Sequence, residues 1–307
     1  MTSLAGIDTL FLYPPLFGKY SPDVQDVKLN KFGLLFHPKV EATIAKAREV
    51  QEFLKSKNLS VWVCSAWEPA DINRFLDGTD LIITVGGDGT ILRAFHAIGD
   101  TAVPVTGINL GKLGFLAELD ASRTLEQLEI LIRGEGWIDE RAMLRVELVS
   151  SGKEPQEFFA LNDVAVGRGD VVRLVKIDVR IDGQLITTYR ADAAVIATAT
   201  GSTGYALAAG GPVMYPGSKD MIVVPVAPHL GLSYPLVVPA ASVVSLTVNT
   251  YHAASLSIDG HDNLPLSDGD TVTAMQSSRI ARLLRFRPKD FFFNTLEQKL
   301  RGKHEPR

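Results

Sequence analysis

The chain has few of the residues that build disulfide scaffolds and clustered metal sites. It contains one cysteine, Cys64, and six histidines in 307 residues. A single thiol excludes a disulfide within the chain and a cysteine-rich metal site. The histidines show no spacing typical of zinc ligands, so we expect no zinc site and no fixed metal site built by the protein. Cys64 ends the apolar run 61–64, which favours a buried strand thiol over a nucleophile.

Long apolar runs and an excess of positive charge are also absent. No stretch reaches the roughly 18 apolar residues of a membrane-spanning helix, and residues 1–15 lack the basic start of a secretory signal. The formal net charge of −4 gives no general attraction to nucleic acid or to anionic membranes. We therefore expect a cytoplasmic protein that binds neither, and that holds any anionic ligand through local groups.

The composition is that of a globular protein with room for two domains. Hydrophobic residues make up 46% of the chain and charged residues 21%, which are ordinary values for folded domains. Residues 1–31 contain three prolines and little periodicity, so we interpret them as an N-terminal extension whose role the sequence does not show.

From residue 32 onward, apolar runs alternate with segments of helical spacing. The expected strands are 32–36, 61–64, 81–85 and 103–108, and the expected helices are 40–57, 90–98 and 124–132. Alternating strands and helices predict a parallel sheet covered by helices. We assign this α/β domain to residues 32–135.

The pattern changes after residue 135, where Gly134 and Gly136 interrupt the rhythm. Apolar residues at 175, 177, 179 and 181 alternate with charged ones, as in a half-exposed strand. Further strands are expected at 144–149, 193–199, 221–226, 236–238, 243–248 and 272–275. These features predict a mainly antiparallel β domain over 136–285, followed by a C-terminal segment, 286–307, with a helix at 291–300.

The turn Gly86-Gly87-Asp88-Gly89-Thr90 is the first candidate functional segment. It follows a predicted buried strand and opens a predicted helix, so its backbone N–H groups can converge on a phosphate. Asp88 can orient a hydroxyl, accept its proton or help to place Mg²⁺. An ordinary tight turn capped by aspartate is the alternative for such a motif taken alone. No Gly-Lys-Ser or Gly-Lys-Thr follows, so the turn is not a Walker loop.

A second glycine-rich segment, 107–116, also follows a predicted strand. Because the carboxyl ends of parallel strands share one edge, it should lie beside the first turn. Its residues Asn109 and Lys112 could face phosphate, although a solvated loop lysine is an equally good interpretation of Lys112.

Two polar segments in the second half could bind a nucleotide. Asn162 and Asp163 follow an apolar run, where they suit ribose hydroxyls or form a simple turn. The stretch 197–205 is rich in small and hydroxyl residues and ends in Tyr205, whose ring could stack on a base; the alternative is a capped loop-to-helix connection. His229 and Asp259 give weaker signals.

Taken in order, these segments resemble the NAD kinase family. The turn at 86–90 resembles the Gly-Gly-Asp-Gly motif of that family, and 107–116 resembles its Gly-Ile-Asn-x-Gly-x-Leu-Gly-Phe-Leu segment. Leu161-Asn162-Asp163 resembles an Asn-Glu pair, 189–192 resembles Tyr-Arg-x-Asp, and 198–205 resembles Thr-Pro-Thr-Gly-Ser-Thr-Ala-Tyr. The resemblance spans about residues 32–300. It implies that the α/β domain is paired with a dinucleotide-binding β-sandwich over 136–285, and that the C-terminal segment, 286–307, returns to the α/β domain.

The resemblance implies transfer of a phosphoryl group from ATP or polyphosphate to the 2'-hydroxyl of the adenosine ribose of NAD⁺, with Mg²⁺ as the expected metal and a homodimer or homotetramer as the expected assembly. Asp88 would be the catalytic residue. The phosphate- or nucleotide-binding residues would be Gly86, Gly87, Gly89, Thr90, Arg93, Asn109 and Lys112. The NAD-binding residues would be Asn162, Asp163, Arg190, Asp192, Thr200, Ser202, Thr203, Gly204 and Tyr205.

Several positions depart from the family pattern, and most of them belong to the expected dinucleotide pocket. Asp163 replaces glutamate and Gly204 replaces alanine; the other departures are Ala193, Ala199, Ala208 and Tyr234. They leave two alternatives open, a kinase of the same fold acting on a lipid or sugar hydroxyl and a non-catalytic sensor of NAD(P). The sequence also does not distinguish ATP from polyphosphate as the phosphoryl donor, or NAD⁺ from NADH as the acceptor.

Overall fold

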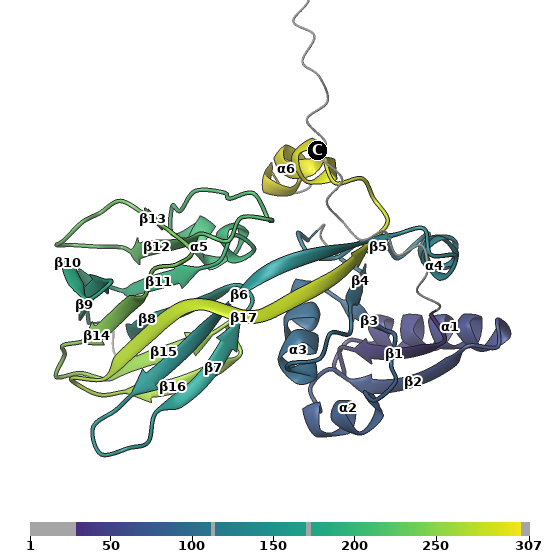
Figure 1. Ribbon diagram of the computed structural model, residues 1–307, viewed down its shortest axis with the longest axis horizontal. Helices are drawn as coiled ribbons and strands as arrows, with labels where there is room; N and C mark the ends of the chain where they lie inside the picture. The colour runs from purple at the N-terminus through teal and green to yellow at the C-terminus, as the bar shows by residue number, and fades with distance from the viewer. Residues whose placement is uncertain (1–28, 112–113, 170–172, 302–307) are drawn as a thin grey trace, which may run out of the picture.

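The computed structural model describes residues 29–111, 114–169 and 173–301, and in it the α/β half precedes the β half along the chain (Figure 1). In this part of the chain no helix has the length and apolarity needed to cross a membrane. The elements of the first half are β1 Lys31–Phe36, α1 Glu41–Ser56, β2 Ser60–Ser65, α2 Pro69–Phe75, β3 Leu81–Gly86, α3 Asp88–Ile98, β4 Val105–Asn109, β5 Leu119–Asp120 and α4 Thr124–Ile132.

The second half is built from strands. Its elements are β6 Trp137–Val149, β7 Gln156–Ala160, β8 Asp163–Arg168, β9 Val175–Ile181, β10 Gln184–Ala191, β11 Ala193–Ala197, a 3₁₀ turn Gly201–Thr203, α5 Tyr205–Ala208, β12 Met221–Val226, β13 Leu236–Val238, β14 Val244–Val248, β15 Ala254–Ile258, β16 Asp262–Leu266, β17 Thr271–Arg285 and α6 Phe291–Arg301.

In the first half, β2, β1, β3 and β4 pair in parallel and in that order. Such pairing requires crossover connections, which α1, α2 and α3 supply. The strands are buried on both faces, with Leu34, Ile82 and Ile83 fully inaccessible, as expected for a covered parallel sheet. The fold class predicted for this half is confirmed.

In the second half, two antiparallel sheets pack face to face. One contains β10, β9, β14 and β17, with β6 paired to β17 and β7 paired to β6, and the other has the order β13-β12-β11-β8-β15-β16. A single core joins them, in which Ile177 and Leu246 of the first sheet cluster with Val164, Ile196 and Val223 of the second. The predicted β-sandwich is therefore confirmed.

Two long antiparallel strands, β6 and β17, run from one half of the molecule to the other (Figure 1). Their pairing extends from Val149 and Thr271 to Trp137 and Arg285, and Leu283 of β17 also pairs in parallel with Val105 of β4. One sheet therefore continues through both halves. The sequence predicted only 144–149 and 272–275, because charged residues such as Glu140 and Arg282 mask the apolar period in the remaining parts.

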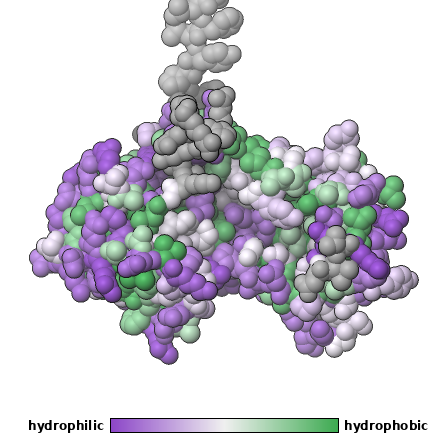
Figure 2. Space-filling view, turned by 180° about the vertical axis from the view of Figure 1, so that it is seen from behind, coloured by the Kyte–Doolittle hydropathy of each residue, from purple (hydrophilic) through white to green (hydrophobic). Residues whose placement is uncertain are grey.

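The C-terminal helix α6 lies above the junction of the two halves (Figure 1). The ring of Phe292 lies 6.4 Å from that of Phe115, which precedes β5, and Phe293 stacks on Tyr215 at 5.6 Å, between ring centroids. The space-filling view from behind shows a waist between the two lobes (Figure 2). The domain boundaries at 31, 135 and 285 remain predictions.

Strand β9 offers a direct test of the period-two prediction. Ile177 is fully buried in the sandwich core, whereas its neighbour Lys176 is exposed. We expect Ile177→Ala to lower the free energy of unfolding by about 2–5 kcal/mol, because it leaves a cavity in the core. The matched variant Lys176→Ala should change it by less than about 0.5 kcal/mol. Denaturant unfolding measures both, and equal effects would contradict the assigned faces.

Candidate active site

The Asp88 carboxylate brings the two glycine-rich segments together. Asp88 begins α3 directly after β3, and its Oδ2 accepts the backbone N–H of Phe115 at 2.7 Å. Its Oδ1 accepts the N–H groups of Leu116 and Ala117, each at 3.2 Å. A Cβ on Gly114 would lie only 2.2 Å from Asp88 Oδ1, so glycine is required for this approach. The two glycine-rich segments therefore lie side by side, as expected from the sequence.

The backbone around Asp88 is open at two of its glycines. A Cβ built on Gly87 or Gly89 meets no atom within 4 Å, whereas one on Gly86 would lie 2.3 Å from the Thr90 hydroxyl. Thr90 is buried, and its N–H donates to the Gly87 carbonyl. Gly86 and Thr90 therefore shape the turn, while Gly87 and Gly89 leave its outer face accessible to an anion.

The other residues expected at the phosphate site lie in different surroundings. Asn109 Oδ1 accepts the N–H of Gly111 at 3.1 Å, which orders the second glycine segment. The Arg93 guanidinium lies 4.3 Å from the centre of the Trp67 ring, and burial lowers the pKa of Arg93. Arg93 thus contacts the α2 side of the first half. Lys112 lies outside the described residues.

A buried carboxylate holds the Asn162 loop in place. Asp259 follows β15 with φ of +49°, and its side chain accepts the backbone N–H groups of residues 161, 162 and 163 at 2.7–3.0 Å. The second oxygen also faces His96 Nε2 at 2.8 Å. Because His96 belongs to α3, this contact ties the loop to the helix that starts at Asp88. In the sequence, Asp259 carries only a weak signal, the glycine that follows it and marks a turn.

Asn162 and Asp163 are brought together with Gly204. A Cβ on Gly204 would lie 3.7 Å from Asp163 Oδ2 and 3.8 Å from Asn162 Nδ2. The Asn162 Oδ1 atom is buried and has no hydrogen-bond partner within the described chain. Burial and the nearby Asp259 charge raise the pKa of Asp163 to about 7, because desolvation and a like charge both disfavour the ionised form. Near neutral pH Asp163 can therefore either accept or donate a hydrogen bond.

Hydroxyl groups of the 198–205 segment are partly used within the protein. Ser202 is fully buried; its hydroxyl donates to the Ala199 carbonyl and accepts the N–H of Met214. The Thr200 hydroxyl accepts a hydrogen bond from Arg141, and that of Thr203 donates to the Thr200 carbonyl. These contacts show that Thr200 and Ser202 first stabilise the turn, and that Thr203, Gly204 and Tyr205 form its accessible end.

Asp192 and Tyr205 line a common pocket of about 270 Å³. Arg168 also lines it and pairs with Asp192 at 3.4 Å, while Tyr205 is 44% exposed. Arg190 is exposed on β10, where its backbone N–H donates to the Leu230 carbonyl. The structure thus gathers several of the expected dinucleotide residues, with Asp192 and Tyr205 around this pocket and Asn162 and Asp163 beside Gly204.

Comparison with known proteins identifies the family of the chain. Two family models match, "ATP-NAD kinase N-terminal domain" over residues 62–136 and "ATP-NAD kinase C-terminal domain" over residues 161–286. An NAD kinase of Dehalococcoides mccartyi is 45% identical over 277 residues, which cover 90% of this chain and 98% of that protein. This chain belongs to the NAD kinase family. A second NAD kinase, from Chloroflexus aggregans, is 36% identical over 273 residues, 89% of this chain and 99% of the relative.

Solved structures of NAD kinases share the fold. The crystal structure of an NAD kinase from Archaeoglobus fulgidus in complex with ATP has a TM-score of 0.71 at 26% identity, and covers 88% of this chain and 98% of that one. The crystal structure of yeast NADH kinase complexed with NADH has a TM-score of 0.77 at 24% identity, and covers 92% of this chain and 90% of that one. At this identity it supports the fold alone. Asp88, Asn162 and the 198–205 turn all lie within the residues that the NAD kinase family models match.

The raised pKa of Asp163 predicts a pH-dependent stability. Its folded pKa of about 7 lies above the ordinary 3.8, so the folded protein holds this proton more tightly than the unfolded chain. Between these two values its contribution to the free energy of unfolding falls as pH rises, by about 1 kcal/mol per unit. Asp163→Asn should therefore be more stable than the native protein at pH 8, and the gap should narrow as pH falls through 7 toward 4. Denaturant unfolding across this range measures the effect; parallel curves would contradict it.

Proposed function

We propose that this chain is an NAD kinase that transfers the γ-phosphoryl group of ATP to the 2'-hydroxyl of the adenosine ribose of NAD⁺, giving NADP⁺. The observation that carries this proposal is the Asp88 carboxylate, held by three backbone N–H groups at the start of α3 within a family-matched segment. ATP as donor is supported by the related Archaeoglobus fulgidus NAD kinase, whose structure contains it.

In the proposed reaction, the ribose 2'-oxygen attacks the γ-phosphorus while the bond from that phosphorus to the β,γ-bridging oxygen breaks. ADP leaves with the bonding electron pair, and the hydroxyl proton passes to Asp88. Among the described residues, Asp88 Oδ2 accepts a single hydrogen bond, from Phe115, so it retains a lone pair for the hydroxyl. The open N–H groups near Gly87 and Gly89 would stabilise charge on the transferred group.

The acceptor would be held by the segments gathered around Gly204. Asn162 and Asp163 would bind the ribose hydroxyls; Thr203, Gly204 and Tyr205 would surround the adenine end, with Thr200 and Ser202 fixing their turn. Asp192, which lines the same pocket as Tyr205, would lie toward the nicotinamide part with Arg190 nearby. The unsatisfied Asn162 Oδ1 atom supports a ligand here, because a buried acceptor without a partner is costly.

The proposal includes Mg²⁺, a homo-oligomer and a cytoplasmic location. Within the described residues, no group of three or more His, Cys, Asp or Glu side chains is arranged to hold a metal. The ion would therefore be carried on phosphate oxygens with Asp88 as the adjacent carboxylate, where it would neutralise developing charge. Exposed apolar side chains on adjacent segments, Leu185, Leu230 and Val237, are 51–59% accessible and support a homodimer or homotetramer.

The assay for the proposed function uses purified protein with ATP, Mg²⁺ and NAD⁺. NADP⁺ should form, and Asp88→Asn should lower kcat by about 10²- to 10⁴-fold, because the proton acceptor is lost. Calorimetric binding of NAD⁺ to the variant serves as the control and should be retained. Absence of NADP⁺ with the native protein, with either ATP or polyphosphate as donor, would overturn the proposal; ATP consumption with a lipid or sugar would favour another acceptor.

Gly114 and Gly111 form a matched pair for testing how Asp88 is placed. A Cβ on Gly114 would overlap the Asp88 carboxylate, whereas one on Gly111 meets no atom of the described residues within 4 Å. Gly114→Ala should displace the carboxylate and reduce kcat on the order of 100-fold, with a loss of stability of about 1–3 kcal/mol. Gly111→Ala should remain close to native in both. Steady-state kinetics and denaturant unfolding separate the two effects, and similar kcat values for the pair would contradict this role.

A further inference from the structure

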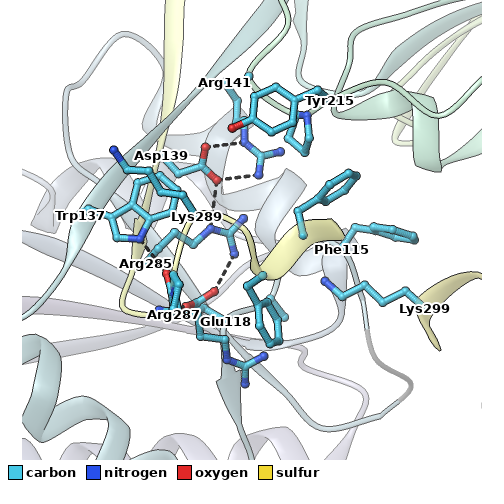
Figure 3. A pocket seen from close by; sticks show the side chains of 16 residues that line it. Phe115, Glu118, Trp137, Asp139, Arg141, Tyr215, Arg285, Arg287, Lys289 and Lys299 are labelled. Carbon is cyan, nitrogen blue, oxygen red and sulfur yellow. Dashed lines mark hydrogen bonds and ion pairs between the residues drawn. The ribbon is translucent and has the colours of Figure 1, made fainter. Parts of the chain in front are cut away.

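A cationic pocket lies between α6 and the paired ends of β6 and β17 (Figure 3). Its cavity volume of about 80 Å³ is several times the roughly 10–15 Å³ that one water needs. Three elements and the segment between β17 and α6 contribute its basic side chains, and Figure 3 shows them gathered around one opening. They are Arg141 from β6, Arg285 from the end of β17, Arg287 and Lys289 from the segment that follows, and Lys299 from α6.

Positive charge exceeds negative charge in this pocket. Asp139 and Glu118 are the two carboxylates among its lining residues, against five basic side chains. Asp120, which does not line the pocket, pairs with Arg287 at 2.9 Å. The carboxylates do fix the arginines: Asp139 binds Arg141 through both oxygens, and Arg285 bridges Asp139 and Glu118. The arginines are therefore rigidly placed in a chain whose formal net charge is −4.

Lys299 is held differently from the arginines. Its ammonium lies 5.2 Å from the centre of the Phe115 ring and 5.8 Å from that of Phe291. In the described residues no carboxylate forms an ion pair with it within 4.0 Å. Burial lowers the pKa of Lys299 to about 8, and Arg285 acts in the same direction. A half-buried cation among other cations gains most from an anionic ligand, because the anion offsets both desolvation and repulsion.

The pocket adjoins the Asp88 carboxylate. Phe115 and Ala117 line it, and the backbone N–H groups of the same two residues donate to Asp88. Asp88 is also close enough to Lys299 to raise its pKa, against the lowering effects of burial and of the arginines. One three-residue turn, 115–117, therefore separates the carboxylate from the cations.

We propose that this pocket binds the phosphate chain of the phosphoryl donor, with Lys299 as the cation that contacts it. This inference rests on the proposed kinase function, because it places the phosphate chain of the phosphoryl donor beside the Asp88 site. The charge excess, the fixed arginines and the unpaired Lys299 ammonium suit a linear polyanion of two or three phosphates. Both ATP and inorganic polyphosphate carry such a chain, and the pocket recognises the feature they share.

The binding test uses inorganic tripolyphosphate and isothermal calorimetry with the full chain. Tripolyphosphate should bind the native protein, Lys299→Met should weaken its binding at least about tenfold, since a hydrogen bond to a charged group is lost, and Lys299→Arg should keep it within a few fold. The control Lys57→Met removes an exposed lysine that pairs with Glu129 and does not line the pocket. This variant should bind tripolyphosphate as the native protein does. Absence of binding to the native protein, or equal binding by Lys299→Met, would overturn the proposal.

Turnover measurements distinguish ATP from inorganic polyphosphate as the source of the phosphate chain. If ATP is the source, Lys299→Met should raise the KM for ATP and leave the KM for NAD⁺ unchanged; if inorganic polyphosphate is, the KM for polyphosphate should rise instead. A raised KM for NAD⁺ alone would overturn the assignment to the donor. Calorimetry needs no turnover, so tripolyphosphate binding without NADP⁺ formation would reject the kinase function and leave the anion site standing.

Discussion

One buried carboxylate, that of Asp259, links the Asn162 loop of the β half to helix α3 of the α/β half. It accepts three backbone N–H groups from residues 161–163 in the β half and faces His96 of α3 in the α/β half. Burying a charge costs several kcal/mol unless its oxygens are satisfied, and here each oxygen has two partners. Because α3 starts at Asp88, the same contact sets the distance between the proposed catalytic carboxylate and the loop proposed to hold the acceptor ribose.

Asp88 is positioned by the same kind of contact, three backbone N–H groups from one turn. Backbone amides orient a carboxylate without placing a cation against it, so the basic side chains stay available to a polyanion. The arginines near the pocket, such as Arg285, pair instead with Glu118 and Asp139. The site thus separates two tasks: amides hold the proton acceptor, and a cluster of guanidinium and ammonium groups lies on the other side of residues 115–117.

The sequence predicted those parts of the site that are local in the chain. A glycine-rich turn after a buried strand is a contiguous pattern, so the placement of Asp88 beside the second glycine segment followed from parallel-sheet geometry. Asp259 could not be predicted in this way, since its partners lie 96–98 residues away at the Asn162 loop and 163 away at His96. The cationic pocket was missed for the same reason. In Ser202, a hydroxyl expected at the ligand is instead satisfied inside the protein, because small polar side chains also cap turns.

Two departures from the family pattern, Asp163 and Gly204, lie next to each other. A Cβ at position 204 would stand 3.7 Å from Asp163 Oδ2 and 3.3 Å from the Gly201 carbonyl oxygen, so a methyl group there would fit tightly. Replacing glutamate by aspartate withdraws the carboxyl group by about one methylene, and replacing alanine by glycine removes the neighbouring methyl. Both changes enlarge the same space. A longer side chain at 163 would bring its carboxyl toward the space beside Gly204, so the two positions act as one unit in shaping the acceptor pocket, and neither residue can be interpreted alone.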